Sequence, residues 1–272
     1  LARHAEFAEG LGVSSDKLRP SMWLTSEDEA FADDVFAEYG LNPDTTIAMF
    51  AGSRTFHRVY EGYGCALRGV EQLKDFSVVA LGGSDDSEIN QRNLEDSGLR
   101  GVNLSGMTAL RQAASIIRRC RLAVGAETGL AHIACAAGVP NVILLGGGHF
   151  GQFIPYSPLT SLVSLPLECY GCDWQCRYQE CHCVRDVPVN VLSEAVRRTL
   201  KKKSDKVRVF VPSEINGGLQ GCSYGIQPLV DRLKWIDTEI ISVPERNKIV
   251  SLAENIVNRA DRNLKDAGIF DG

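Results

Sequence analysis

The stretch from Cys120 to Tyr156 constrains the fold of this chain more than any other. It opens with a short apolar run, Leu122–Val124, which ends at a glycine, as a buried strand does when it enters a tight turn. Thr128 is placed to cap a helix, which a glycine and a proline then stop, and residues 142–145 form a second apolar run. Strand, turn, helix and strand in this order predict a βαβ unit. Its two strand-end turns should lie on one edge of a parallel sheet, where such folds bind ligands.

The residues at these two turns favour an anionic ligand. The candidate binding residues are Glu127, Thr128, Gly129, His132, Gly147, Gly148 and His149. A helix N-terminus attracts phosphate, a glycine run can form a backbone nest, and the two histidines can hydrogen-bond a diphosphate. The glutamate has the wrong sign for phosphate, so we assign it to a sugar hydroxyl. Each feature also has a plainer explanation as a turn or a structural histidine, and only their combination predicts a site.

Residues 125–148 resemble the donor-binding segment of glycosyltransferase family 9, the ADP-heptose:lipopolysaccharide heptosyltransferases and their relatives. Members of this family carry Asp-Thr-Gly-x-x-His-x-Ala at the head of the helix. Here residues 127–134 read Glu-Thr-Gly-Leu-Ala-His-Ile-Ala, so Glu127 replaces the aspartate. The following run, GGGHFGQFIPY, resembles less characterised members of the family rather than the core heptosyltransferases. A related sugar is therefore an alternative to heptose.

The resemblance implies an α/β fold, a Rossmann-like parallel sheet with helices on both faces that forms the C-terminal half of a GT-B enzyme. It also implies four more donor-binding residues: Ser53, Arg58, Asp86 and Met107. Arg58 falls where relatives place a phosphate-neutralising lysine, and Asp86 follows a glycine turn where relatives hold the ribose. Alternatives are an exposed basic loop for Arg58, helix capping at residues 84–85, and a core methionine at Met107.

The resemblance covers about residues 1–200, and with the remainder the chain is expected to have three parts. Residues 1–45 are expected to form an interdomain connector and helices, and residues 46–200 the nucleotide-sugar-binding domain with a cysteine-rich loop at 169–183. Ser26 is expected to cap a helix of the first part, and Thr108 a helix of the second. Residues 201–272 are expected to be a linker followed by an extra βα segment, with strands at 207–211 and 239–243 and a helix at 228–235. This segment is either the start of another module or an extension that packs on the sheet.

Five cysteines fall between residues 169 and 183. Thiolates so close in sequence can surround one tetrahedral zinc or iron ion, and in a reducing cytosol a metal is more natural than disulfides. The family resemblance favours Cys169, Cys172, Cys176 and Cys183 as the ligands of a structural ion, with no catalytic metal. The alternative is a set of reduced cysteines.

Composition limits the kinds of partner and the cellular location that we expect for this chain. The chain has 272 residues, of which 44% are hydrophobic and 23% charged, which is typical of a protein with a packed core. Its net charge of -5 gives no reason to expect nucleic acid or an anionic membrane as a partner. We find neither a membrane-spanning run nor a signal peptide, so we expect a cytoplasmic protein.

The family resemblance implies an inverting, metal-independent glycosyltransferase. It would move a heptose or related sugar from a nucleoside-diphosphate donor to a hydroxyl of a glycan, glycolipid or protein acceptor. The family's general base lies in the N-terminal acceptor domain, so we expect it outside this chain and expect the isolated chain to be inactive. The alternative is a non-catalytic nucleotide-sugar-binding or assembly module.

Overall fold

The computed structural model describes residues 7–14, 20–148, 157, 159–165, 172–176, 178, 180–201, 207–215 and 233–240. The helices are α2 (Ser26–Glu38), α3 (Tyr63–Arg68), α4 (Ser87–Ser97), α5 (Leu110–Arg119), α6 (Gly129–Ala136), α7 (His182–Arg185) and α8 (Val189–Lys201). Short 3-10 helices are η2 (Pro43–Thr45), η3 (Phe56–Arg58), η4 (Glu71–Leu73) and η5 (Ser84–Asp86). The strands are β1 (Thr46–Phe50), β2 (Ser77–Ala80), β3 (Arg100–Asn103), β4 (Leu122–Ala126), β5 (Asn141–Leu144), β6 (Thr160–Val163), β7 (Val207–Ile215) and β8 (Leu233–Ile240).

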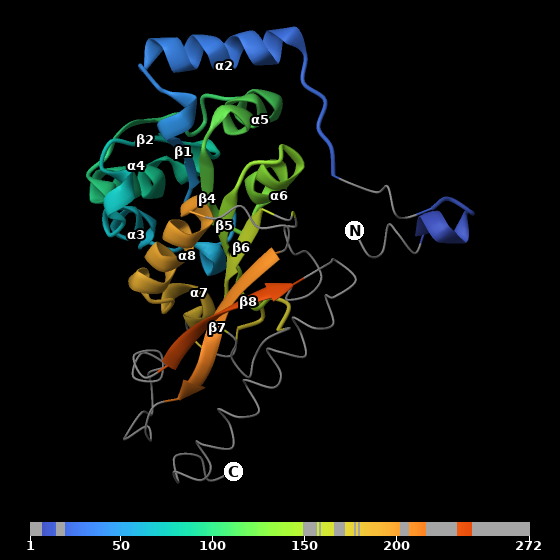
Figure 1. Cartoon of the computed structure of the whole chain (residues 1–272), viewed down its shortest axis with the longest axis vertical. Coiled ribbons are helices and arrows are strands. Elements are labelled where there is room, and N and C mark those ends of the chain that lie inside the picture. The colour runs from blue at the N-terminus through green and yellow to red at the C-terminus, as the bar shows by residue number, and fades with distance from the viewer. Residues whose placement is uncertain are drawn as a thin grey trace.

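All described strands belong to one sheet, in the order β3-β2-β1-β4-β5-β6-β7-β8 (Figure 1). Every neighbouring pair from β3 to β7 is parallel, and only β8 runs antiparallel, against β7. The chain builds outward from β1 to β3 and then returns to place β4 on the other side of β1. The loops that follow β1 and β4 therefore diverge at a topological switch point, where open α/β sheets bind ligands.

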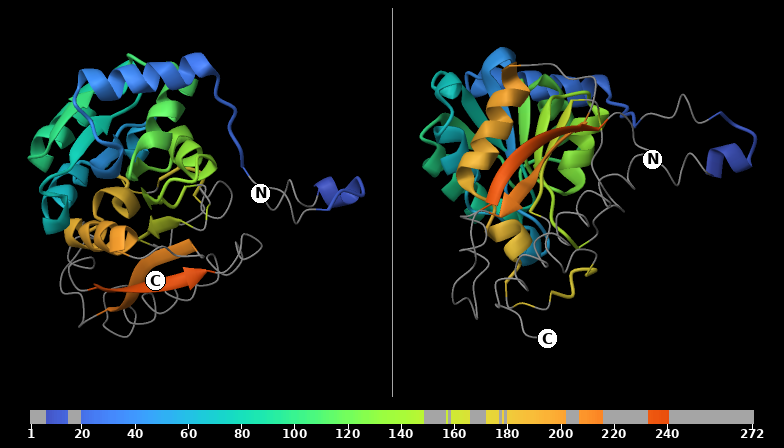
Figure 2. Two further views of the ribbon diagram at one scale, coloured as in Figure 1. Left: turned by 45° about the horizontal axis from the view of Figure 1, so that its top comes forward. Right: turned by 60° about the horizontal axis from the view of Figure 1, so that its bottom comes forward.

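Helices cover both faces of this sheet, as the sequence predicted (Figure 2). On one face, apolar residues of α3 and α8 pack against the strands around Tyr63, Leu67 and Leu192. On the other face, α2, α5 and α6 do the same around Phe36, Ile116 and Ile133. The strands between the two cores are nearly all buried, so they consist of continuous apolar runs rather than alternating patterns.

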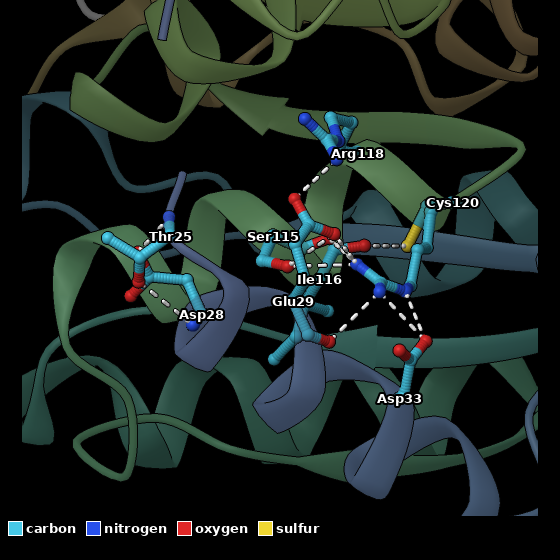
Figure 3. Close-up of polar contacts among 9 residues, drawn as sticks. Thr25, Asp28, Glu29, Asp33, Ser115, Ile116, Arg118 and Cys120 are labelled. Carbon is cyan, nitrogen blue, oxygen red and sulfur yellow. Dashed lines mark hydrogen bonds and ion pairs between the residues drawn. The ribbon is translucent and has the colours of Figure 1, made fainter. Parts of the chain in front are cut away.

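Helix α2 is held to α5 by a set of ion pairs as well as by its apolar face (Figure 3). The Arg119 guanidinium donates to Glu29 Oε2 at 2.6 Å and contacts Asp33 Oδ1 at 2.8 Å. Arg118 pairs with the other oxygen of Glu29. The first of the three predicted parts therefore ends in a helix that is packed against the sheet domain.

Three local predictions are wrong in detail. Helix α2 is capped by Thr25, one residue before Ser26, in a capping box: Thr25 Oγ1 accepts the Asp28 N–H, and the Asp28 carboxylate accepts the Thr25 N–H. Helix α5 begins after Ala109 rather than Thr108, since the Gln112 side chain accepts the Ala109 N–H at 2.8 Å. Residues 233–235 are part of strand β8 and not of a helix.

The segment after α8 joins the existing sheet. Strand β7 pairs in parallel with β6, with Leu162 opposite Val209, and β8 turns back along β7. In the described residues this is a ββ pair rather than the expected βα segment. Residues 202–206, 216–232 and 241–272 lie outside the described residues, so the assignment of the whole segment stays a prediction.

Candidate functional site

Arg58 and Glu127 meet across the switch point between β1 and β4. Arg58 ends the short helix η3 in the loop that follows β1, and Glu127 is the first residue after β4. Arg58 Nη1 donates to the Glu127 carbonyl oxygen at 3.0 Å and lies 4.0 Å from its carboxylate oxygen Oε1. The Arg58 guanidinium therefore links the loop after β1 to the loop after β4.

Glu127 is buried, with 4% of its surface exposed. Burial raises the pKa of its carboxyl to about 7, and the Arg58 charge lowers it only in part. Near neutral pH this side chain therefore exists in both protonation states. In its protonated form it can donate a hydrogen bond, and in its ionised form it can accept one.

The N-terminus of α6 opens beside this pair. Thr128 takes the extended capping conformation, but among the described residues its hydroxyl does not cap the helix; its carbonyl oxygen accepts the Ala131 N–H at 3.1 Å. Gly129 is exposed, and a side chain there would meet no atom within 4 Å. This space leaves the first backbone N–H groups approachable, which suits an anion. Surrounding atoms desolvate the His132 ring and lower its pKa, although the residue remains open to solvent.

The glycine turn after β5 is covered by a tryptophan instead of being open. Trp174 packs on Gly146 and Gly148, and a Cβ atom at Gly146 would lie 2.7 Å from Trp174 Cη2. Gly147 donates its N–H to Cys183 Sγ at 3.4 Å. The assignment of Gly147 and Gly148 to a phosphate nest stays a prediction, and His149 lies outside the described residues.

Asp86 stands at the turn that follows β2, next to the turn that follows β1. Its Oδ2 accepts the Gly83 N–H at 2.8 Å, and its side chain occupies the space that a Cβ at Gly52 would need. Asp86 therefore closes its own turn, and its assigned role at the ribose stays a prediction. Ser53 lies partly exposed in the same region and accepts the Thr55 N–H at 3.4 Å.

Asn90 was not among the predicted residues, yet it ties three strand-end turns together. It is fully buried in α4, where its Oδ1 accepts the Ala51 N–H at 2.9 Å. Its Nδ2 donates to the Leu81 carbonyl oxygen at 3.1 Å and to Ser105 Oγ at 2.7 Å. No motif signals this role, because one asparagine in a polar helix resembles a solvated residue until the fold is known.

Met107 projects from the turn after β3 with 63% of its surface exposed. It is not a core residue, which removes the alternative considered for it. An exposed methionine at a strand end offers apolar contact area to a flat ligand. Its assignment to the base stays a prediction.

The cysteine cluster does not form a metal site in the described residues. Cys172 and Cys176 are partly exposed and Cys181 and Cys183 are buried, whereas Cys169 lies outside the described residues. Burial and the neighbouring thiols of Cys176, Cys183 and Cys172 raise the pKa of Cys181. Over the residues that the structure describes, no group of three or more His, Cys, Asp or Glu side chains is placed to hold a metal. Because one of the four predicted ligands, Cys169, lies outside the described residues, the structural ion stays a prediction.

The sheet order, the two helical layers and the site at the strand ends define a Rossmann-like α/β domain. The family model for glycosyltransferase family 9 (heptosyltransferase) matches residues 2–182. The chain belongs to this family, as the sequence resemblance indicated.

Two solved structures share the fold. The ADP-heptose lipopolysaccharide heptosyltransferase II of E. coli matches with a TM-score of 0.53 and 21% identity, over 70% of this chain and 56% of that one. The glycosyl transferase family 9 protein of Veillonella parvula DSM 2008 matches with a TM-score of 0.52 and 23% identity, over 58% of this chain and 46% of that one. The present chain thus spans about half the length of these proteins. No curated protein sequence matches it.

Within the described part of the chain, no helix is both long enough and apolar enough to cross a membrane.

Proposed function

We propose that this chain is the donor-binding half of a glycosyltransferase that uses a nucleoside-diphosphate sugar. The observation that supports this best is the Arg58 guanidinium, which bridges the β1 and β4 loops at the switch point beside the N-terminus of α6. A guanidinium and free backbone N–H groups on one sheet edge suit two phosphate groups. The related E. coli protein is named for ADP-heptose, and we extend this donor class to the present chain.

In this proposal the protein assists departure of the nucleoside diphosphate. Negative charge grows on the leaving phosphate in the transition state, and fixed donors near it lower the barrier. Arg58 supplies a charged donor, while Thr128 and Gly129 mark the helix end that supplies backbone donors. Glu127 is placed to bind a sugar hydroxyl, and its raised pKa allows it to donate as well as accept. Transfer with inversion needs a base on an acceptor-binding domain, so we place that base outside this chain.

Calorimetry with ADP, GDP and UDP, each compared with its monophosphate, tests the proposal. We expect one diphosphate to bind at least about tenfold more tightly than its monophosphate, because the second phosphate adds a charge-assisted contact. Equal affinity for the two would contradict a diphosphate site.

Turnover is the second measurement. The purified 272-residue chain should bind the diphosphate and transfer no sugar, since one half of a two-domain cleft lacks the acceptor side. Sugar transfer by this chain alone would refute the proposal that donor binding and acceptor binding belong to separate domains. A longer form of the protein that binds the donor but never transfers sugar would instead indicate a non-catalytic binding module.

A structural zinc or iron ion at the cysteines remains a separate prediction. Elemental analysis of protein purified without chelator would give about one ion per chain if Cys169 completes a four-ligand site. Protein without metal, together with thiols that react freely under reducing conditions, would exclude it. Cys120 and Cys135 are buried and have raised pKa values, so they should react only after unfolding whatever the metal content.

A further inference from the structure

Trp174 contacts two parts of the candidate site that lie far apart in the sequence, Arg58 and the glycine turn after β5. The Arg58 Cζ atom lies 4.6 Å from the centroid of the Trp174 ring, within the range of a cation–π interaction. The same indole packs on Gly146 and Gly148 in the turn after β5. One aromatic side chain from the cysteine loop therefore lies between the arginine and the glycine turn.

The glycine turn is shaped to receive this ring. A Cβ atom at Gly148 would collide with the Trp174 ring, and one at Gly146 would lie 2.7 Å from its Cη2. The Asp173 N–H donates to the Gly148 carbonyl oxygen at 3.0 Å, which fixes the loop to the same turn. The glycines thus provide the space for an indole, a role that differs from a nest for phosphate.

The backbone of the loop adopts an unusual conformation at this contact. Asp173 and Trp174 have φ angles of 52° and 60°, in the left-handed region that non-glycine residues rarely enter. A bulky residue adopts it only where the surrounding contacts favour it, and such positions gather at functional sites. Here the conformation places the Trp174 ring against Arg58 and the glycine turn at once.

We propose that Trp174 is a positioning residue that holds the Arg58 guanidinium over the β1/β4 switch point for a diphosphate. This rests on the proposed function. A free arginine side chain loses rotamer entropy when it binds, whereas one already held by an indole loses less, so its affinity for phosphate is higher. The cysteine loop is then part of the donor site, and a change in its conformation would alter diphosphate binding.

A double-mutant cycle tests the proposal through the nucleoside diphosphate that binds best among ADP, GDP and UDP. Trp174→Ala should weaken binding by roughly threefold to thirtyfold, from the range of cation–π energies. In the Arg58→Ala background the same change should have almost no further effect, because the residue to be positioned is gone. Trp174→Phe, which keeps an aromatic face, should restore most of the affinity. Equal losses in both backgrounds would overturn the proposal, since they would show that Trp174 acts without Arg58.

Trp23→Ala is the matched control, because Trp23 is 83% exposed, and it should leave the affinity unchanged. A loss as large as that of Trp174→Ala would also overturn the proposal, since it would show a general effect of removing tryptophan.

A ligand-free measurement separates this proposal from the proposed function. In a variant with Trp23→Phe and Trp235→Phe, Trp174 is the only tryptophan left, and its emission reports its surroundings. Arg58→Ala should shift this emission, whereas Arg54→Ala in the same loop should not. If ADP, GDP and UDP all fail to bind the unmodified chain, the proposed function fails. The Trp174 emission still tests whether Arg58 and Trp174 are in contact. Identical spectra with and without Arg58 would overturn the positioning role.

Discussion

At Glu127, burial outweighs the attraction of a neighbouring cation. The folded state raises the pKa of this carboxyl from 4.5 to about 7, whereas in the unfolded chain it ionises near its ordinary value. Between these two pH values the folded chain binds more protons than the unfolded chain, so stability from this group falls as pH rises. The contribution is fully present below about pH 4.5 and lost above about pH 7.

Glu127→Gln removes this titration and nearly keeps the shape of the side chain. The free energy of unfolding of the wild type, relative to this variant, should fall by roughly 2–3 kcal/mol between pH 4.5 and pH 8. Denaturant titrations of both proteins at several pH values measure it. Glu88→Gln, at a highly exposed position, should show no such trend; a constant difference for Glu127→Gln would contradict the raised pKa.

For two neighbouring tyrosines, we expect opposite effects on stability when the hydroxyl group is removed. The Tyr60 hydroxyl donates to the Val187 carbonyl oxygen at 2.8 Å. The Tyr63 hydroxyl is fully buried and has no hydrogen-bond partner within the described part of the chain. Their rings pack edge to face at 5.1 Å, so both sit in the same core.

Tyr60→Phe should therefore lower stability by about 1 kcal/mol, because it leaves a buried carbonyl without its donor. Tyr63→Phe should leave stability unchanged or raise it by up to about 1–2 kcal/mol, since it removes a buried polar group. Thermal unfolding of the two variants provides the comparison. A Tyr63→Phe variant less stable than Tyr60→Phe would show that this hydroxyl is paired in solution.

The site residues show what a sequence can predict at this scale. Glu127 and Thr128 were identified because they follow a predicted strand end, and Arg58 was identified through the family resemblance; the structure brings Arg58 and Glu127 together. Asn90 and Trp174 were missed, because their contacts are made by backbone groups and rings from other parts of the chain. Contacts of that kind depend on the tertiary fold and leave no local pattern.

Among the elements, α2 depends on α5 through Arg119. This side chain is 17% exposed and contacts Glu29, Asp33 and Ser115, so its removal takes a cation away from two carboxylates, of which Glu29 keeps its pair with Arg118. Partial burial lowers the pKa of Arg119, but the hydrogen bonds that it donates to Asp33 and Glu29 outweigh this and raise the pKa, so the cation is always present. The contact is therefore stronger than an ordinary surface ion pair.

Arg119→Ala should destabilise the protein by about 1–3 kcal/mol, the usual cost of breaking a partly buried charged network. Arg118→Ala, at a position 47% exposed, should cost less than about 1 kcal/mol. Denaturant unfolding in low salt and in about 1 M salt distinguishes the two, because salt screens the exposed pair far more. Equal effects of both substitutions would show that α2 is held by its apolar face alone.

The boundaries of helices and strands were predicted from local residue propensities with mixed success. Strands such as β4 and β5 were predicted well because buried parallel strands are continuous apolar runs. Two helix starts were displaced by one residue each because several neighbouring residues can cap, and the tertiary position decides which one does. Residues 233–235 were assigned to a helix, although pairing along β7 holds them in a strand.

At the scale of the whole molecule, the strand order determines that the candidate site lies at the β1/β4 edge of the sheet. The residues of one segment predicted a βαβ unit, and the family resemblance implied a parallel sheet with helices on both faces. The sequence could not predict that β4 is added on the other side of β1 instead of beyond β3, which makes the β1/β4 edge the switch point. Nor could it predict that β7 extends the same sheet, because a lone apolar run does not specify its neighbour.

Affinity for a nucleoside diphosphate, with and without Arg58, tests the central claim most directly. Arg58→Ala removes a charge-assisted contact of about 1.5–3 kcal/mol and should weaken binding by roughly 10- to 150-fold in calorimetry. Arg54→Ala removes a cation from the same loop and should change affinity by less than about threefold, as expected for an exposed charge. Equal affinity of the Arg58→Ala variant and the unmodified chain would contradict a diphosphate site at the β1/β4 switch point.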